Sequence, residues 1–267
     1  MVRRGIWTED LALIAAAARA AGAVALGFFG QSPEVWWKNK DRSPVSAADF
    51  AANECLEGML RPARPGYGWL SEETEDSDER LKRDTVFVID PIDGTRAFIA
   101  GETTWCVSVA VVHQGRPVAG ALYAPALDEE YLATVDGGAI KNGAPLSVGA
   151  WHHDRAMKIA VAEDMLARMP EEARGSISRI RHVPSLAYRL AMVADGRIDG
   201  TLVKRNSHDW DLAAADLILQ QAGGSLVDLE GQPLVYNQPD VRHGVLCGAS
   251  RNVAEPLRQH LAALHHG

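Results

Sequence analysis

Hydrophobic residues in this chain follow two patterns, a long apolar stretch with helical length and many short runs typical of strands. Residues 11–29 are almost wholly apolar and rich in alanine. We expect a core helix here, capped by Thr8 and ended near Gly30. Because acidic residues precede it and Arg19 lies in its middle, this stretch is not typical of a membrane-spanning or signal segment.

A second helix is predicted at residues 47–60. It follows a polar segment, residues 31–42, which we expect to form a loop or a short edge strand. Pro62 would end the helix, because proline has no N–H for the helical ladder. Asp49 would lie in the first turn, where the helix dipole favours a carboxylate.

Shorter apolar runs predict strands in both halves of the chain. Residues 105–134 hold several such runs separated by turn signals, which is the pattern of an antiparallel meander. A helix is expected at 185–194 and another at 208–222, whose apolar positions lie on one face. We expect an N-terminal α+β half, 1–150, and a C-terminal α/β half, 151–267.

Two carboxylates follow the most apolar predicted strand, residues 86–89. The segment Asp90-Pro91-Ile92-Asp93-Gly94-Thr95 delivers them three residues apart, because Pro91 breaks the strand pattern. Carboxylates and a backbone carbonyl are ligands that suit Mg²⁺. The amides and hydroxyl of Gly94 and Thr95 suit a phosphate oxygen.

Two further acids have comparable positions. Glu72 follows a short apolar run, 67–70, and Asp211 lies in the first turn of the predicted helix 208–222. Clustered carboxylates repel one another and do not stay ionised in a low-dielectric cleft unless cations neutralise them. Together with the first two acids, they predict a metal-dependent phosphatase.

Charge and cysteine content narrow the function classes. The 27 Lys and Arg residues against 35 Asp and Glu residues give a formal net charge of −8. This argues against nucleic-acid or anionic-membrane partners, which require a basic face, but not against an anionic substrate, since bound metal would reverse the local sign. Cys55, Cys106 and Cys247 are too few for a disulfide framework or a thiolate metal site, and a cytoplasmic location is expected by default.

These motifs, in this order, resemble the inositol monophosphatase superfamily over nearly the whole chain, of the inositol monophosphatase or bacterial 3′(2′),5′-bisphosphate nucleotidase type. The resemblance implies a layered αβαβα sandwich of the α+β class, commonly assembled as a homodimer, and a metal-dependent phosphoric monoester hydrolase sensitive to lithium. The motifs that carry it are Ser43–Asp49, Ser71-Glu72-Glu73, Asp90–Thr95, Asn142-Gly143, Trp210-Asp211 and Ala222-Gly223-Gly224.

The resemblance also implies how the site residues are used. The expected ligands of two or three Mg²⁺ ions are Glu72, Asp90, Asp93, Asp211 and the carbonyl of Ile92. The amides of Gly94 and Thr95 would cradle the phosphate of a small phosphate ester, which Asp93 and Asp211 would also contact. Thr95, with Asp49 and Glu72, would polarise a metal-bound water for in-line attack without a phosphoenzyme. Most ligands would come from the N-terminal half, and Asp211 from the C-terminal half.

The substrate is less narrowly implied. Ser71 and the Pro184-Ser185-Leu186 segment resemble the nucleotidases, whereas Ile92 matches the inositol-type motif. The best candidates are 3′-phosphoadenosine 5′-phosphate and inositol 1-phosphate, with histidinol phosphate and fructose 1,6-bisphosphate as alternatives. The family pattern has a lysine a few residues before the segment that begins at Ser43. In this chain that lysine is displaced, and Lys38 and Lys40 both lie near its expected position.

Other functions stay open at this point. Asp90–Thr95 superficially resembles the D-x-D-G-T motif of aspartyl-phosphate phosphatases, but two residues rather than one separate its acids. A regulatory binding protein is the non-enzymatic alternative. His208 could contact the substrate or be structural, and Trp36 and Trp37 could pack in the core, at a subunit interface or against a substrate ring.

Overall fold

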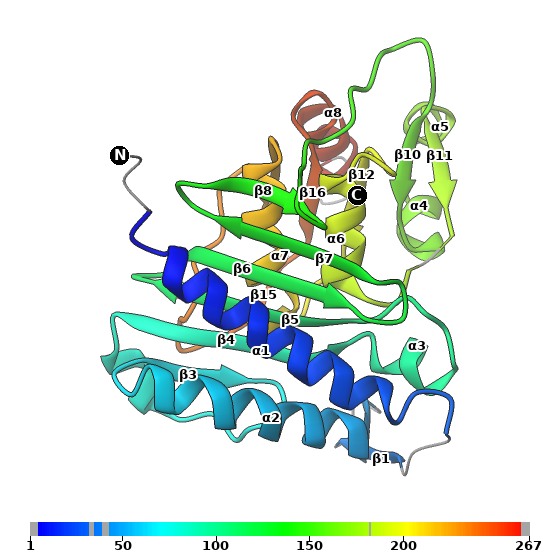
Figure 1. Ribbon diagram of the computed structural model, residues 1–267. Coiled ribbons are helices and arrows are strands. Elements are labelled where there is room, and N and C mark those ends of the chain that lie inside the picture. Colours follow the sequence, from blue (N-terminus) through cyan, green and yellow to red (C-terminus); the bar gives the residue numbers. More distant parts are fainter. Residues whose placement is uncertain (1–4, 32–34, 39–42, 182, 263–267) are drawn as a thin grey trace.

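The chain folds into five layers in the order helix, sheet, helix, sheet, helix (Figure 1). The computed structural model describes residues 5–31, 35–38, 43–181 and 183–262. The helices are α1 (Thr8–Leu26), α2 (Ala47–Ala63), α3 (Thr95–Ile99), α4 (Glu163–Ala167), α5 (Glu171–Gly175), α6 (Leu186–Ala194), α7 (Asp209–Gln221) and α8 (Arg251–Ala262), with a 3₁₀ turn, η1 (Asp78–Lys82). The expected αβαβα class is confirmed.

The first sheet has seven strands arranged in chain order. They are β3 (Gly68–Ser71), β4 (Thr85–Asp93), β5 (Cys106–His113), β6 (Arg116–Ala124), β7 (Glu129–Thr134), β8 (Gly138–Lys141) and β9 (Ala144–Pro145). β3 and β4 run parallel, and every later pair is antiparallel. The meander predicted from the turn signals is therefore present.

The second sheet has five strands in the order β11-β10-β12-β16-β14. They are β10 (Met157–Ala160), β11 (Ile177–Ile180), β12 (Gly200–Val203), β14 (Gly224–Val227) and β16 (Leu246–Ser250). Two short pairs complete the structure: β1 (Val35–Lys38) with β2 (Ser43–Ser46), and β13 (Ser207–His208) with β15 (Arg242–His243).

Apolar cores fill the spaces between the layers. α1 and α2 pack on one face of the first sheet, α6 and α7 lie between the two sheets, and α4, α5 and α8 pack on the outer face of the second sheet. α7 is buried on almost every side rather than on one face alone. A Cβ at Gly120 of β6 would lie 2.9 Å from the carbonyl oxygen of Ala214 of α7, so this glycine lets the helix pack directly on the sheet.

Some element ends differ from the sequence prediction. Thr8 is the first residue of α1 and not its cap, because Trp7 occupies the N-cap position without a side-chain hydrogen bond. The helix ends at Leu26, and a turn carries the chain to Gly30, whose φ is +75°. α2 extends to Ala63, because a proline in the last turn removes only one ladder hydrogen bond.

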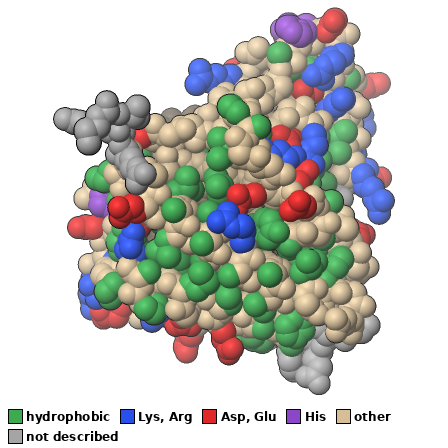
Figure 2. Space-filling view, viewed as in Figure 1, with side chains coloured by type: hydrophobic (Ala, Val, Ile, Leu, Met, Phe, Trp, Pro, Cys, Tyr) green, Lys and Arg blue, Asp and Glu red, His purple; other side chains and the backbone are tan. Residues whose placement is uncertain are grey.

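The outer face formed by α1 and α2 carries apolar and charged side chains side by side (Figure 2). Leu26 of α1 and Phe50 of α2 are among the exposed large hydrophobic residues. In the described parts of the chain, no helix has both the length and the apolar character needed to cross a membrane. Assembly as a homodimer stays a prediction.

Candidate active site

Parallel pairing of β3 and β4 brings the first two acids together. Ser71 lies opposite Ile89 in the register, and the amide of Glu72 donates to the carbonyl of Ile89 (3.1 Å). Because the two strands run parallel and Ser71 pairs with Ile89, the next residues, Glu72 and Asp90, lie side by side at the same edge of the sheet. Asp90 is 1% exposed, and the amide of Ile92 donates to its Oδ1 (3.0 Å).

β4 does not stop at Pro91, as the sequence suggested, but continues to Asp93 through an irregularity in its pairing with β5. A bulge of this kind turns side chains toward a new direction. Gly94 follows with a φ of +93°, and a Cβ there would lie 3.0 Å from the Cβ of Ser185. Gly94 therefore permits both the left-handed turn and the close approach of the segment that opens α6.

The opening of α6 holds Asp93 in place. The hydroxyl of Ser185 and the amide of Ala187 (2.6 Å) donate to Asp93 Oδ2, and the amide of Leu186 donates more weakly to Oδ1 (3.3 Å). Ser185 is also the N-cap of α6, accepting from the amide of Tyr188 (3.1 Å). Asp93 is thus fixed by a helix start that lies 92 residues further along the chain.

Asp211 reaches the same place from the first turn of α7. The amide of His208 donates to its Oδ2 (2.7 Å), as in a capping box. One oxygen each of Asp90, Asp93 and Asp211 lie within 4.8 Å of one another. The acids predicted from distant parts of the sequence therefore meet, and all of them, with Glu72, line one cleft.

Asp49 and Thr95 form a second group beside these acids. Asp49 is 1% exposed, and the amide and hydroxyl of Ser46 donate to its Oδ2 (2.9 and 2.6 Å). The hydroxyl of Thr95 lies 3.1 Å from Asp49 Oδ1 and equally far from the carbonyl of Ile92. Thr95 is the first residue of α3, so the amides of this turn have no intrahelical acceptor.

Mutual repulsion dominates the electrostatics of the cluster. Burial, followed by the charge of Glu72 and the other nearby acids, raises the pKa of Asp90 well above its ordinary value. Burial and then the charge of Asp211 raise the pKa of Asp93 to about 7, although the hydrogen bond from Ser185 acts in the opposite direction. Without a compensating cation, these carboxyls hold protons at a pH where isolated aspartates are ionised.

A hard divalent cation fits this donor set. The acids offer only oxygen ligands, and one oxygen each of Asp90, Asp93 and Asp211 are close enough to share an ion. Glu72 and Ile92 line the same cleft, and the carbonyl of Ile92 lies 3.1 Å from the hydroxyl of Thr95. A bound cation supplies neutralising charge and polarises phosphoryl oxygens.

The cleft has a volume of about 610 Å³ and carries opposite charges along its wall. Besides the acids, basic side chains line it: Arg96, Arg189, Lys204 and Arg205. The sequence prediction missed these residues and the role of Ser185, since no local motif links them to the acids. Burial lowers the pKa of Arg189 to about 10, against the influence of Asp93, so its guanidinium is still charged at neutral pH.

The other residues singled out from the sequence, a histidine, two tryptophans and two lysines, are not placed in the cleft by the described structure. The imidazole of His208 stacks on Trp210, with ring centroids 4.5 Å apart, and it is not among the residues that line the cleft. Trp36, Trp37 and Lys38 belong to β1, whose backbone alone is described. Lys40 lies outside the described residues.

Comparisons with known proteins agree with this site. The sequence profile of the inositol monophosphatase family matches residues 7–265. Inositol-1-monophosphatase of Mesorhizobium japonicum is 36% identical over 207 residues, which cover 70% of this chain and 73% of that protein. The 3′(2′),5′-bisphosphate nucleotidase CysQ of Aggregatibacter actinomycetemcomitans is 32% identical over 79% of this chain and 81% of its own length.

A solved structure shows the same architecture. The extragenic suppressor protein suhB of Bartonella henselae superposes with a TM-score of 0.84 at 29% identity, covering 95% of this chain and 98% of its own. The profile match extends across the segments that build the acidic cleft. This chain therefore belongs to the inositol monophosphatase family and is a phosphomonoesterase of that metal-dependent family.

Proposed function

We propose that this phosphomonoesterase uses Mg²⁺ to hydrolyse a small phosphorylated metabolite, with water as the nucleophile. The observation that carries the proposal is the meeting of two buried acids of β4 with the half-buried Asp211 of α7 in one cleft beside Thr95. The Mg²⁺ ligands are Glu72, Asp90, Asp93, Asp211 and the carbonyl of Ile92, and the cluster holds two or three ions. Such ions would neutralise the acids and orient the phosphoryl group.

The protein's own groups orient the attacking water and the phosphate. Because the Thr95 hydroxyl lies 3.1 Å from Asp49 Oδ1, it can donate to that carboxylate and accept a hydrogen bond from water. Asp49, with Glu72 nearby, is then the proton acceptor. The amides of Gly94 and Thr95 hold the phosphate oxygens at the start of α3.

The names of the relatives described above point to two substrate classes. One is a 3′(2′),5′-bisphosphate nucleotide such as 3′-phosphoadenosine 5′-phosphate, and the other is inositol 1-phosphate. Histidinol phosphate is an alternative, since a relative from Chlorobaculum parvum, 31% identical, carries the name histidinol-phosphatase. Fructose 1,6-bisphosphate is a further alternative.

A phosphate-release screen tests the proposal. The purified protein would be incubated with each of these compounds and Mg²⁺, and with chelator as the control. We expect Mg²⁺-dependent release from at least one compound and no trapped acyl-phosphate on Asp90. If no phosphomonoester is hydrolysed, a regulatory binding role takes precedence; a phosphorylated Asp90 would instead indicate the aspartyl-phosphate mechanism.

Lithium offers a second test of the metal site. From the family resemblance, we expect millimolar lithium to inhibit Mg²⁺-dependent phosphate release. Sodium chloride at equal ionic strength is the control, because it separates a specific ion effect from charge screening. Full activity in high lithium would contradict the proposed type of metal site.

A further inference from the structure

We infer that the basic side of the cleft binds a second phosphate of the substrate, so that the preferred substrate class is a small bisphosphorylated metabolite. This inference rests on the proposed function, because it assumes that the acidic side holds the phosphate to be cleaved. The residues that carry it are Arg189 of α6, and Lys204 and Arg205 of the loop between β12 and β13.

Arg189 is the first indication. Its Nε atom is fully buried and has no hydrogen-bond partner within the described structure. Its Nη1 donates to the carbonyl of Val183 at 3.3 Å. A buried guanidinium is usually paired with a carboxylate, because an unpaired buried donor costs free energy. An anionic ligand in the cleft would supply the missing acceptor.

Lys204 and Arg205 extend the positive charge toward solvent. Lys204 pairs with Asp164 (2.8 Å), but both side chains are more than half exposed, and such surface pairs exchange readily. No carboxylate in the described ranges forms an ion pair with Arg205, which is exposed at the cleft. The two side chains are therefore available to an arriving anion.

The size and lining of the cleft fit a molecule with phosphates at both ends. A cleft of about 610 Å³ exceeds the needs of a single phosphoryl group and falls in the range of sites for nucleotide-sized ligands. Apolar residues, among them Pro184, Leu186 and Leu202, also line the cleft and can contact a sugar or a base.

Phosphate fits the basic side better than a neutral polyol does. Guanidinium groups form paired hydrogen bonds with phosphate oxygens and stay charged at neutral pH. A polyol hydroxyl is neutral, so it would leave the positive charge of the buried arginine without a compensating anion, which is unfavourable for binding. The basic side therefore favours a bisphosphate over inositol 1-phosphate.

Matched substrates test the inference with the full-length protein and Mg²⁺. 3′-Phosphoadenosine 5′-phosphate would be compared with adenosine 3′-monophosphate, and fructose 1,6-bisphosphate with fructose 1-phosphate. We expect kcat/KM for the bisphosphate to be at least about tenfold higher in one of the two pairs, mainly through KM. The pair that shows the preference identifies the carrier of the second phosphate. Equal kcat/KM within both pairs would overturn the inference and leave the proposed function intact.

Variants locate the preference. Arg205→Gln and Arg189→Gln are expected to reduce the bisphosphate preference about tenfold. Arg83→Gln, an exposed arginine outside this cleft, is the matched control and should leave the preference unchanged. If the arginines only balance the charge of the acids, both members of a pair will slow equally, and the inference is wrong.

A binding measurement separates this inference from the proposed function. Calorimetric titration with the potential products adenosine 5′-monophosphate and fructose 6-phosphate, against adenosine and fructose, reports on the second phosphate site without turnover. We expect one phosphorylated compound to bind more tightly than its unphosphorylated partner, and Arg205→Gln to remove the difference. Absence of hydrolysis with intact phosphate-dependent binding would defeat the proposed function alone, whereas equal binding in both pairs would defeat the inference.

Discussion

The aspartates of the acidic cluster are all held in place by hydrogen bonds from nearby backbone amides. Asp90, Asp93 and Asp211 each accept a backbone N–H with at least one oxygen, which fixes the side chain. Asp49 is fixed in the same way by Ser46. The acids are thus oriented before any ion or substrate arrives, so little reorganisation is needed on binding.

Replacing Asp90 with asparagine should separate function from stability. The change keeps the shape and the acceptor for the amide of Ile92 but removes a buried charge that its neighbours oppose. We predict that Asp90→Asn lowers kcat/KM at least about a hundredfold while the metal-free protein becomes more stable at pH 8, by about 1 kcal/mol or more. Phosphate release and urea unfolding measure the two effects.

Asp93→Asn is the informative comparison, because Asp93 also holds the opening of α6. The Oδ2 atom of Asp93 accepts from both Ser185 and Ala187, and Oδ1 accepts from Leu186. An asparagine side chain has only one oxygen, so its NH₂ group would face at least one of these donors without accepting a hydrogen bond. We expect this variant to lose activity and also about 1–2 kcal/mol of stability. If Asp90→Asn were instead destabilised and active, the carboxylate of Asp90 would be structural.

The acids could be predicted from the sequence because each is marked locally. Asp90 follows a long buried strand, and Asp211 opens a helix, so apolar periodicity places both. The start of a helix at Ser185 could be predicted as well, but its hydrogen bond to Asp93 and the place of Arg189 in the cleft could not, since both come from packing against a segment about ninety positions away. Tertiary packing creates that information, and a local pattern does not contain it.

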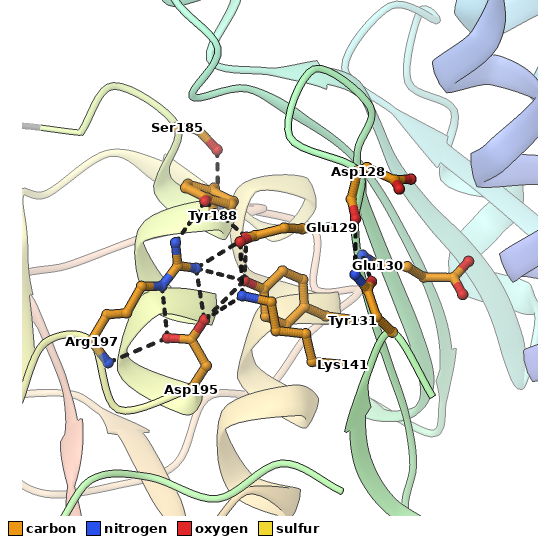
Figure 3. Close-up of polar contacts among 10 residues, drawn as sticks. Asp128, Glu129, Glu130, Tyr131, Lys141, Ser185, Tyr188, Asp195 and Arg197 are labelled. Atoms are coloured by element: carbon orange, nitrogen blue, oxygen red, sulfur yellow. Dashed lines mark hydrogen bonds and ion pairs between the residues drawn. The ribbon is translucent and has the colours of Figure 1, made fainter. Parts of the chain in front are cut away.

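At the scale of elements, α6 is anchored at both of its ends. Ser185 and Asp93 hold the start, and a polar network holds the end against β7 and β8 (Figure 3). At the end of the helix, Lys141 of β8 donates to the C-cap residue Asp195 (2.9 Å). The same network reaches Tyr188 in the first turn, which donates to Glu129 (2.9 Å) and accepts from Arg197 (2.8 Å). Although burial acts in the opposite direction, hydrogen bonds, the first of them from Lys141, lower the pKa of Glu129 to about 2.

Removing the cap of α6 should affect both stability and activity. Ser185→Ala deletes the N-cap oxygen and one of the donors to Asp93. We predict a stability loss of about 0.5–2 kcal/mol and, because Asp93 loses part of its anchor, a reduced affinity for Mg²⁺. The matched control is Ser77→Ala, which removes the cap of η1 away from the cleft. Equal Mg²⁺ affinity in the two variants would contradict the positioning role of Ser185.

The polar network around Tyr188, in the first turn of α6, should matter more for stability than for chemistry. Tyr188→Phe keeps the buried ring but leaves Glu129 and Arg197 each without one hydrogen bond. We predict a loss of about 1–2 kcal/mol in urea unfolding with kcat within about twofold of the parent protein. A tenfold fall in kcat at unchanged stability would show that the network acts on the site itself.

Some strands could be predicted from the sequence pattern, whereas features that depend on pairing with another strand could not. The antiparallel meander at 105–134 was placed correctly, because short apolar runs between turn signals have few alternatives. The continuation of β4 beyond Pro91 was missed, because the bulge depends on pairing with β5, which the sequence of β4 does not reveal. The apolar face of α7 was predicted, but its burial on nearly every side depends on the two sheets that enclose the helix.

At the scale of the whole molecule, the site draws on both halves of the chain. α7 belongs to the C-terminal half, 151–267, yet it packs against β5 and β6 of the first sheet. The hydroxyl of Ser108 on β5 donates to the carbonyl of Trp210, next to Asp211. A cation held by Asp90 and Asp211, as proposed above, would link elements from both halves and should therefore stabilise the whole fold.

This linkage gives an unusual dependence of stability on pH. In the metal-free protein, the pKa of Asp93 is raised from 3.8 to about 7, first by burial and then by Asp211. Between these values the folded state holds a proton that the unfolded state has released, so the free energy of unfolding falls as pH rises toward 7. Asp90 shifts in the same direction, and Asp216, raised to about 6 by burial, contributes at lower pH.

We therefore predict that the metal-free protein melts at a higher temperature at pH 6 than at pH 8. Asp93 alone contributes about 1.4 kcal/mol over this interval, which corresponds to a shift of roughly 2–3 °C for a chain of this size. Saturating Mg²⁺ should remove or reverse the difference, because the ion replaces the protons as the compensating charge. Calorimetry with and without chelator measures both, and Asp90→Asn should show a smaller difference. A metal-free melting temperature that is equal at the two pH values, or that rises toward pH 8, would contradict the assignment of raised pKa values to this cluster.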